Sequence, residues 1–280
     1  MKIYKLLSFL LLSISCVSQN SLEEYLIDDD GICIEKPDST KTYDKVYNSN
    51  NNIYKIGKTI TYSYYYENKN GEKFLIKKGK DILQPEGYSI SGWEFINIEK
   101  QDNETVNKII LKVSSGNPFK DFLQDYNQTS ISYEYLMKNG NFLGKETTGA
   151  IENEANVWIH PPRSNFFGIL EINPFPYIKS PLKIGTQWSW NLEIGDSWSD
   201  KRWLEWKGSI LNLYKYEIIG KSIISSKLGN LECYIVKAEA ESRIGKTELI
   251  SYFNQEYGFI KLEYKNIDET KIILEIEKLE

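Results

Sequence analysis

The segment Gln187-Trp188-Ser189-Trp190-Asn191-Leu192-Glu193-Ile194 alternates large apolar side chains with polar ones. Successive side chains of an extended strand point to opposite faces, so the four apolar residues share one buried face and the polar residues face water. Strands with one wet face pair antiparallel, because parallel strands covered by helices are apolar on both faces. The sequence therefore predicts an all-β fold, a curved antiparallel sheet that forms a barrel or a sandwich, with short peripheral helices. The same alternation recurs in residues 234–240, 260–264 and 272–276.

Length and composition agree with a globular β protein. The chain has 280 residues, enough for one large β domain or two smaller ones. Aromatic residues make up 14% of the chain, including 20 Tyr and 7 Trp, which favours strands over helices. The formal net charge of -5 argues against nucleic acid as a partner, because phosphate binding needs a basic surface. One His and three Cys are too few for a zinc site, and we expect no metal and no cofactor.

The first 20 residues have the layout of a secretory signal. Two early lysines precede an apolar run that is too short to span a membrane, and small residues follow. Two cleavage sites remain open. Ser13-Ile14-Ser15-Cys16 resembles a bacterial lipobox, with Cys16 as the lipidated first residue, whereas Cys16-Val17-Ser18 fits ordinary signal peptidase and makes residues 1–18 the signal peptide. We expect an extracytoplasmic protein, either a lipoprotein of the bacterial cell envelope or a soluble periplasmic or secreted protein.

Two cysteines, Cys33 and Cys233, stay in the mature chain after either cleavage. In an oxidising compartment a pair of cysteines is commonly joined, so the sequence predicts a disulfide between Cys33 and Cys233. The alternative is that Cys233 is a small buried residue of a strand.

Composition divides the chain after the signal into four parts. The first is polar and is expected to be an irregular tether, and the two longest are β units separated by a loop rich in proline and aromatic residues. A Lys-Ile-Gly sequence precedes an aromatic strand in both β units, which indicates either an internal duplication or a common way to begin a strand. The four parts are a polar N-terminal extension over 19–52, a β unit over 53–155, the loop over 156–181 and a β unit over 182–280.

Local signals add turns and short helices to this outline. Asn-Gly at 70–71 and at 139–140 predicts two tight hairpin turns, because glycine supplies the positive φ that such turns require. A capping-box pattern at 21–24 and the segment 117–125 are the two places where we expect a short helix.

Residues 156–181 are the most unusual segment. They hold five of the eight prolines, which excludes a central strand or a regular helix. They are also rich in large apolar side chains, unlike a flexible linker. We expect a rigid packed loop across one end of the sheet or between the two units, and such loops also line ligand sites.

The only imidazole of the chain lies in this segment, at His160, three residues before Arg163. One interpretation makes His160 a general base or a ligand-binding group, with Arg163 alongside to hold a carboxylate or phosphate. The other interpretation, which we favour, is a hydrogen-bonded His fixed between a strand end and two prolines. A hydrolase that uses His160 and nearby carboxylates is therefore the less favoured alternative, and the chain has no Gly-x-Ser-x-Gly motif.

A second candidate site lies in residues 196–207, where three tryptophans occur among acidic and basic side chains. Exposed aromatic faces beside paired acids are how proteins bind sugars, so a glycan- or lipid-binding surface is one interpretation. The other is that the tryptophans pack in the core and the charges form surface ion pairs. The candidate residues are Trp198, Trp203, Trp206, Asp196 and Asp200.

The last third of the chain resembles the exported bacterial β proteins called TapB-like. The resemblance rests on Ile-Gly-Thr-Gln-Trp at 184–188, Leu-Gly-Asn-Leu-Glu-Cys-Tyr at 228–234 and the Tyr-rich segment 252–261. It implies a curved antiparallel sheet in an exported protein, and it implies no catalytic residues.

Together these patterns predict a non-catalytic exported protein that acts as a binding module or a cell-envelope scaffold. Its expected partners are an envelope protein, a glycan or a lipid, and membrane contact would come only through a lipid anchor on Cys16. If the tryptophans of 196–207 bind a ligand, they should line a concave face; if the protein is a scaffold, those rings should be buried.

Overall fold

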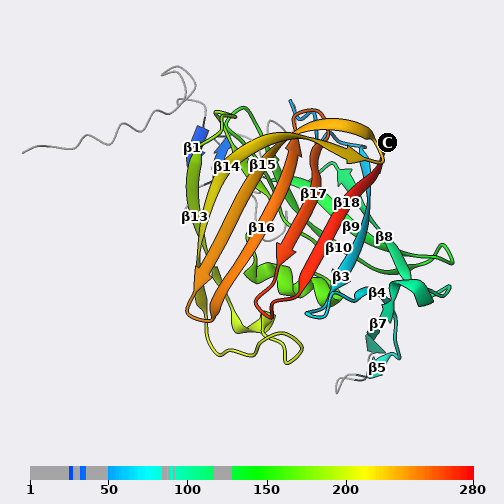
Figure 1. Cartoon of the computed structure of the whole chain (residues 1–280). Coiled ribbons are helices and arrows are strands. Elements are labelled where there is room, and N and C mark those ends of the chain that lie inside the picture. Colours follow the sequence, from blue (N-terminus) through cyan, green and yellow to red (C-terminus); the bar gives the residue numbers. More distant parts are fainter. Residues whose placement is uncertain are drawn as a thin grey trace, which may run out of the picture.

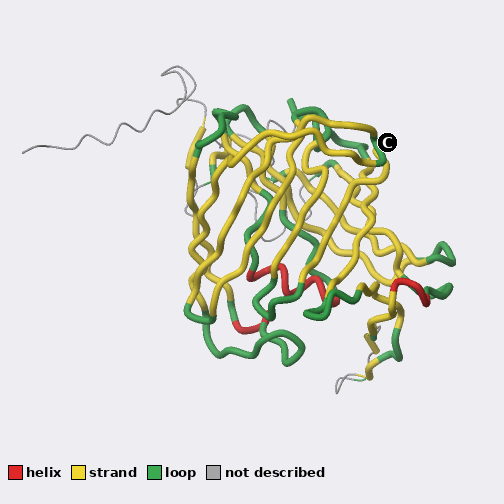
Figure 2. The backbone as a smooth tube through the Cα atoms, viewed as in Figure 1, coloured by secondary structure: helices red, strands yellow, loops and turns green. Residues whose placement is uncertain are grey.

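One antiparallel sheet of 14 strands dominates the computed structural model, which describes residues 25–27, 32–35, 50–83, 87, 89–90, 92–116 and 128–280 (Figures 1 and 2). The all-β fold class is therefore confirmed. In spatial order the sheet consists of β12 (Tyr177–Lys179), β11 (Asn156–Ile159), β10 (Phe142–Glu152), β9 (Thr129–Met137), β8 (Val106–Ser114), β3 (Thr59–Glu67), β18 (Lys271–Leu279), β17 (Gly258–Lys265), β16 (Gly245–Asn254), β15 (Gly229–Ser242), β14 (Ile210–Ser226) and β13 (Gln187–Ile194), with β4 (Lys73–Lys78) and β7 (Trp93–Asn97) branching from β3.

The remaining elements are short. Within the described ranges, two small hairpins lie outside the main sheet, and three 3-10 helices connect its strands. These elements are β1 (Tyr25–Ile27) with β2 (Cys33–Glu35), β5 (Ile82–Leu83) with β6 (Ser89–Ile90), and the helices η2 (Ile98–Lys100), η3 (Asn165–Ile172) and η4 (Asp196–Trp198). The helices expected at 21–24 and 117–125 lie outside the described residues.

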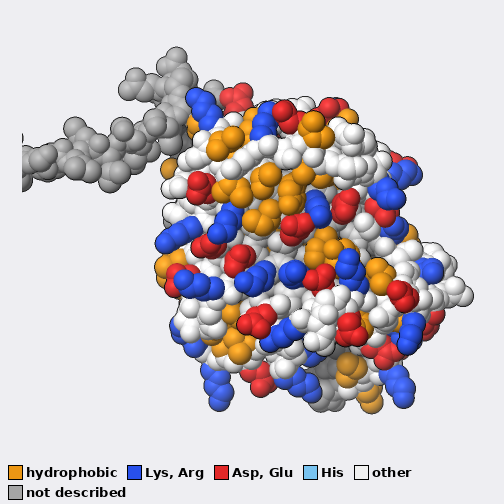
Figure 3. Space-filling view, viewed as in Figure 1, with side chains coloured by type: hydrophobic (Ala, Val, Ile, Leu, Met, Phe, Trp, Pro, Cys, Tyr) orange, Lys and Arg blue, Asp and Glu red, His pale blue; other side chains and the backbone are white. Residues whose placement is uncertain are grey.

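Alternation along the strands decides which face is buried. In β13, Trp190 and Ile194 are buried, whereas Ser189 and Glu193 are exposed, as the sequence predicted. The outer faces of β13 to β18 carry interspersed acidic and basic side chains (Figure 3). Both Asn-Gly turns are confirmed, because Gly71 and Gly140 adopt positive φ between paired strands.

Strands of the two predicted β units form one continuous sheet. β3 of the first unit pairs with β18 of the second over residues 60–67 and 271–279. The Lys-Ile-Gly sequences lead into β3, in the middle of the sheet, and towards β13, at its edge.

The sheet curls until its two edges meet at a seam, which we define as the line where β11 and β12 face β13. No ladder of backbone hydrogen bonds joins β12 to β13, both of which are fully described. Aromatic rings make the contact instead: the ring centroids of Tyr177 and Trp188 are 5.6 Å apart, and those of Trp158 and Trp190 are 6.3 Å apart. Side-chain packing therefore holds the nearly closed barrel together at the seam.

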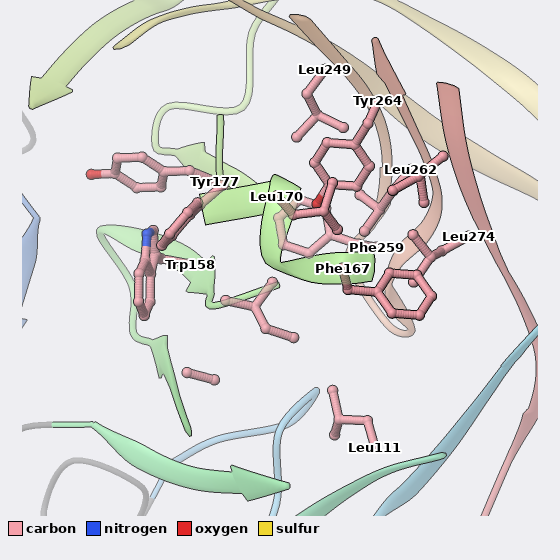
Figure 4. Packing of buried hydrophobic residues seen from close by; sticks show 14 of the residues in the cluster. Leu111, Trp158, Phe167, Leu170, Tyr177, Leu249, Phe259, Leu262, Tyr264 and Leu274 are labelled. Carbon is pink, nitrogen blue, oxygen red and sulfur yellow. The ribbon is translucent and has the colours of Figure 1, made fainter. Parts of the chain in front are cut away.

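The segment 156–181 enters the interior of this barrel. Its first and last parts form the edge strands β11 and β12, and the prolines lie at or beyond the strand ends, where a missing N–H is tolerated. Between them η3 is almost completely buried against the concave face of the sheet, and its Phe167 and Leu170 belong to the packed core (Figure 4). Phe167 stacks on Tyr135 of β9, with the ring centroids 5.6 Å apart. The predicted packed loop is thus more regular than expected, and it fills the core.

Polar side chains of the sheet fix the end of η3. The carbonyl of Ile172 accepts hydrogen bonds from Asn212 Nδ2 of β14 and from Thr247 Oγ1 of β16. Asn173 Nδ2 donates to Ile169 O and to Asn266 Oδ1. Because buried backbone carbonyls need partners, these bonds determine how η3 sits inside the barrel.

The expectation that the N-terminal extension is irregular is wrong for residues 25–27 and 33–35. β1 and β2 form an antiparallel hairpin, and Ile32 and Ile34 are buried. The backbone of Cys33 is held by β11, because Cys33 N donates to Asn156 Oδ1 and Cys33 O accepts from Asn156 Nδ2. A few apolar residues with matched backbone partners are enough to dock this hairpin beside the seam.

The predicted disulfide between Cys33 and Cys233 is also wrong. Both cysteines are free and buried. Cys33 contacts Asn156 of β11, near one edge of the sheet, whereas Cys233 lies in β15, towards the other edge. Burial raises the pKa of the Cys233 thiol to about 11, so it behaves as the small buried residue of the alternative interpretation. Cys16 lies outside the described residues. No helix among the described residues is long and apolar enough to cross a membrane.

Candidate functional site

A cavity of about 310 Å³ opens along the seam, and we call it the seam cavity. Its volume lies within the range of small-molecule sites. β11 and the residues after it form one wall, and β13 with Gly195 and Trp198 forms the other. The lining residues are Ile32, Gln128, Trp158, His160, Arg163, Glu171, Phe175, Trp190, Leu192, Glu193, Ile194, Gly195 and Trp198.

Aromatic rings make one continuous wall of the seam cavity. Phe175 lies 5.6 Å from Trp190, 5.8 Å from Trp158 and 4.7 Å from the His160 ring, measured between ring centroids. Trp190 is further fixed because its Nε1 donates to the Tyr216 hydroxyl at 2.8 Å. Trp158 Nε1, in contrast, is a buried donor with no partner among the described residues. The wall offers apolar π surface and one unused N–H group.

Three ionisable side chains meet inside this cavity. His160 Nε2 lies 3.4 Å from Glu171 Oε1, and Arg163 Nη1 lies 3.9 Å from the same oxygen. The other imidazole nitrogen, Nδ1, lies 2.7 Å from the Pro161 carbonyl oxygen. Since a carbonyl only accepts, Nδ1 carries the proton, and the lone pair of Nε2 faces Glu171.

Burial shifts both titrations of this pair. The pKa of His160 falls to about 3, because burial disfavours the charged imidazolium and the nearby Arg163 guanidinium repels it. The pKa of Glu171 rises to about 7, because burial disfavours the carboxylate and Glu146 adds repulsion, while Arg163 opposes the rise. At neutral pH His160 is therefore neutral and Glu171 is close to half ionised.

A second carboxylate, that of Glu146, holds the loop that positions these groups. Glu146 Oε1 accepts from Arg163 N at 2.9 Å and from the Tyr135 hydroxyl at 2.6 Å, and Oε2 accepts from Ser164 Oγ at 2.7 Å. Arg163 Nη2 also donates to Thr147 O. Because these three bonds hold both oxygens of Glu146, its role is to position the loop, whereas Glu171 Oε1 accepts no hydrogen bond from the described residues.

Glu171 Oε1 has no hydrogen-bond partner among the described residues, although the Glu171 side chain is only 6% exposed. A buried carboxylate oxygen without a donor is unfavourable, and such a group in a cavity is typical of a ligand site.

The seam cavity contains only some of the residues singled out in the sequence. His160, Arg163 and Trp198 line it together. Trp206 is buried, and Trp203 packs on Phe166 and donates from Nε1 to Trp198 O.

The two acidic candidates of 196–207 are bonded to groups within residues 196–208. Asp196 Oδ2 accepts from Gly208 N, and Asp200 is paired with Arg202, whose hydrogen bonds lower the pKa of Asp200. The three tryptophans therefore do not form one exposed platform.

Glu171, Trp158, Trp190 and Phe175 were not selected from the sequence as site residues. The signal for Glu171 was present, because it is the only charged residue between Arg163 and Lys179, inside an apolar run. The three aromatic residues carried no signal, since an aromatic residue on the buried face of a strand normally packs in the core. No group of three or more His, Cys, Asp or Glu in the described part of the chain could hold a metal ion.

No family model matches the chain, and no curated protein matches it. The resemblance to TapB-like proteins therefore stays a prediction.

Some solved structures are similar over most of the chain. An exported protein with a YmcC-like fold from Bacteroides fragilis is 12% identical, with a TM-score of 0.45, over 81% of this chain and 96% of that one. A lipoprotein from Parabacteroides distasonis is 12% identical, with a TM-score of 0.43, over 80% and 95%. The hypothetical lipoprotein YmcC from Escherichia coli is 10% identical, with a TM-score of 0.34, over 79% and 84%. Identities and TM-scores this low transfer no function.

Proposed function

We propose that the protein is an exported, non-catalytic binding protein that takes a small ligand into the seam cavity. The observation that carries the proposal is the unpartnered Glu171 carboxylate oxygen, buried beside His160 and a wall of aromatic rings. Apolar walls with a few convergent polar groups are the usual composition of ligand sites.

The arrangement supports binding better than hydrolysis by a Ser-His-acid triad. Such a triad needs a hydroxyl within hydrogen-bond reach of the imidazole. The hydroxyl nearest in sequence, Ser164 Oγ, donates to Glu146 instead. His160 Nδ1 is held by the Pro161 carbonyl, and the low pKa of His160 makes its Nε2 a weak base.

Export is supported by the signal layout of the first 20 residues and is tested by intact-mass measurement of the protein isolated from its native cells. We expect a mature chain that lacks at least residues 1–15. A lipid mass on Cys16 identifies an envelope lipoprotein, and a chain that begins at Gln19 or Asn20 identifies a soluble form. A full-length chain that retains Met1 would contradict export.

Binding in the seam cavity is tested by blocking it. Gly195 lines the cavity, and an added Cβ there meets only Ser197 Oγ, at 3.8 Å, so Gly195→Leu fills space without backbone strain. Gly144→Leu is the matched control, because Gly144 lies in β10 away from the cavity and a Cβ there meets nothing within 4 Å.

A small-molecule fragment library is screened by ligand-observed NMR against the three proteins. We expect fragments that bind the wild type and Gly144→Leu, and that lose at least about tenfold in affinity for Gly195→Leu, because filling a pocket removes the apolar contacts. If no fragment distinguishes Gly195→Leu from the other two proteins, the proposed site is wrong.

A further inference from the structure

We infer that the seam cavity selects ligands that carry an ammonium group, which would donate hydrogen bonds to both Glu171 Oε1 and His160 Nε2. This inference rests on the proposed binding function and names the chemical class of the ligand. It follows from the hydrogen-bonding capacity, the aromatic walls and the charge of the cavity.

The cavity presents two hydrogen-bond acceptors, so a matching ligand must carry a donor. Glu171 Oε1 lacks a partner among the described residues, and His160 Nε2 is an acceptor because Nδ1 carries the proton. These two acceptors lie only 3.4 Å apart. An ammonium nitrogen, which has up to three N–H donors and no acceptor, can bond to both at once. A single hydroxyl can donate to only one of them.

The aromatic walls suit the same group. Trp158, Trp190, Phe175 and Trp198 line the same cavity as the two acceptors. An ammonium ion near an aromatic face is attracted by the negative potential of the ring, and the attraction grows when water is excluded. Trp190 and Phe175 are both less than 5% exposed, so little of either ring faces bulk water.

The charges around the cavity also favour a cation. Glu171 is faced by His160 at the end of β11, by Arg163 in the loop that follows and by Glu146 of β10, and Glu193 of β13 contributes another carboxylate to the lining. His160 is neutral, so ionised Glu171 leaves the lining with two carboxylates and one guanidinium. The Arg163 guanidinium has other partners besides Glu171, because Nη2 donates to Thr147 O and the guanidinium lies over the Trp198 ring.

A matched pair of probes tests the inference: cyclohexylamine and cyclohexanol, which share a ring and differ in the ammonium group. Binding to the full mature protein is followed by the indole N–H signals of Trp158, Trp190 and Trp198 in two-dimensional NMR. At pH 8 we expect cyclohexylamine to bind roughly tenfold or more tightly than cyclohexanol, because a charge-assisted hydrogen bond adds to the shared ring contacts.

The affinity for cyclohexylamine should rise roughly tenfold between pH 6 and pH 8. Over this range Glu171, with a pKa of about 7, changes from mostly protonated to mostly ionised, while the amine stays charged. The affinity for cyclohexanol should stay nearly constant. This measurement uses only the wild-type protein, so it does not depend on the folding of a variant.

The variant Glu171→Gln should remove both the amine preference and its pH dependence. Glu154→Gln is the control, because Glu154 is exposed, lies outside the seam cavity and loses the same charge.

Three outcomes separate this inference from the proposed function. Cyclohexanol binding as tightly as cyclohexylamine, with the same indole shifts, would overturn the ammonium inference and leave the binding function intact. An amine preference that survives in Glu171→Gln would also overturn it. If neither compound shifts the three indole signals, the inference fails, and the fragment comparison with Gly195→Leu decides the proposed function.

Discussion

Replacement of Trp190 by alanine is expected to lower the free energy of unfolding by about 3–5 kcal/mol. Trp190 is 4% exposed and stacks on Tyr214 at 4.7 Å. Its ring also meets Phe175 and Trp158 across the seam, and its Nε1 donates to the Tyr216 hydroxyl. Alanine removes all of these contacts and leaves a void where no backbone ladder joins the sheet edges.

Urea unfolding, followed by far-UV circular dichroism, measures this loss of stability. Trp198→Ala is the control, because Trp198 is only half-buried and belongs to no strand of the sheet. We expect the control to lose about 1 kcal/mol or less. A Trp190→Ala protein as stable as Trp198→Ala would mean that the rings at the seam do not hold the barrel together.

Replacement of Glu171 by glutamine is expected to stabilise the protein at pH 8 by about 3 kcal/mol and to have little effect at pH 4. Folded Glu171 keeps its proton up to about pH 7, whereas the unfolded chain releases it near the ordinary pKa of 4.5. Between these pH values the folded state binds more protons, so the free energy of unfolding of the wild type falls as pH rises. Glutamine stays neutral and removes this fall.

His160 contributes in the opposite direction in both proteins. Its folded pKa of about 3 lies below its ordinary value of 6.5, so its contribution to the free energy of unfolding rises with pH between 3 and 6.5. The two contributions oppose each other between pH 4.5 and 6.5 in the wild type, and only the rise remains in Glu171→Gln. Urea unfolding of both proteins from pH 4 to pH 8 gives the difference directly. A stability difference that does not change with pH would mean that Glu171 is ionised normally in the folded protein.

Glu171 links the stability of the protein to its proposed binding function. A carboxylate that destabilises the folded protein at neutral pH is expected where a ligand later satisfies it. Glu171→Gln should therefore be the more stable protein and the poorer binder.

The strands could be predicted from the sequence because their signal is local. Alternation in 187–194 and the Asn-Gly turns depend on neighbouring residues, and both are confirmed. Closure of the barrel could not be predicted, because it depends on strand order and on ring contacts between Trp158 and Trp190, which are 32 positions apart in sequence. The docking of β1 and β2 depends on Asn156, which is more than 100 residues away along the chain.

The candidate site was predictable in part for the same reason. His160 and Arg163 stand out as rare or charged residues among prolines, and the structure places both in the seam cavity. Glu171 joins them only because η3 folds back inside the barrel. Trp203, Trp206, Asp196 and Asp200 are clustered in sequence, but local packing and turn hydrogen bonds use them outside the cavity.

The most direct test of the central claim is a crystal structure of the mature protein grown at pH 8 with cyclohexylamine. We predict density for the amine in the seam cavity, with its nitrogen within hydrogen-bond distance of Glu171 Oε1 and His160 Nε2 and its ring against Trp158 and Trp190. A seam cavity that is empty or holds only water, with the amine absent or bound elsewhere, would contradict the account.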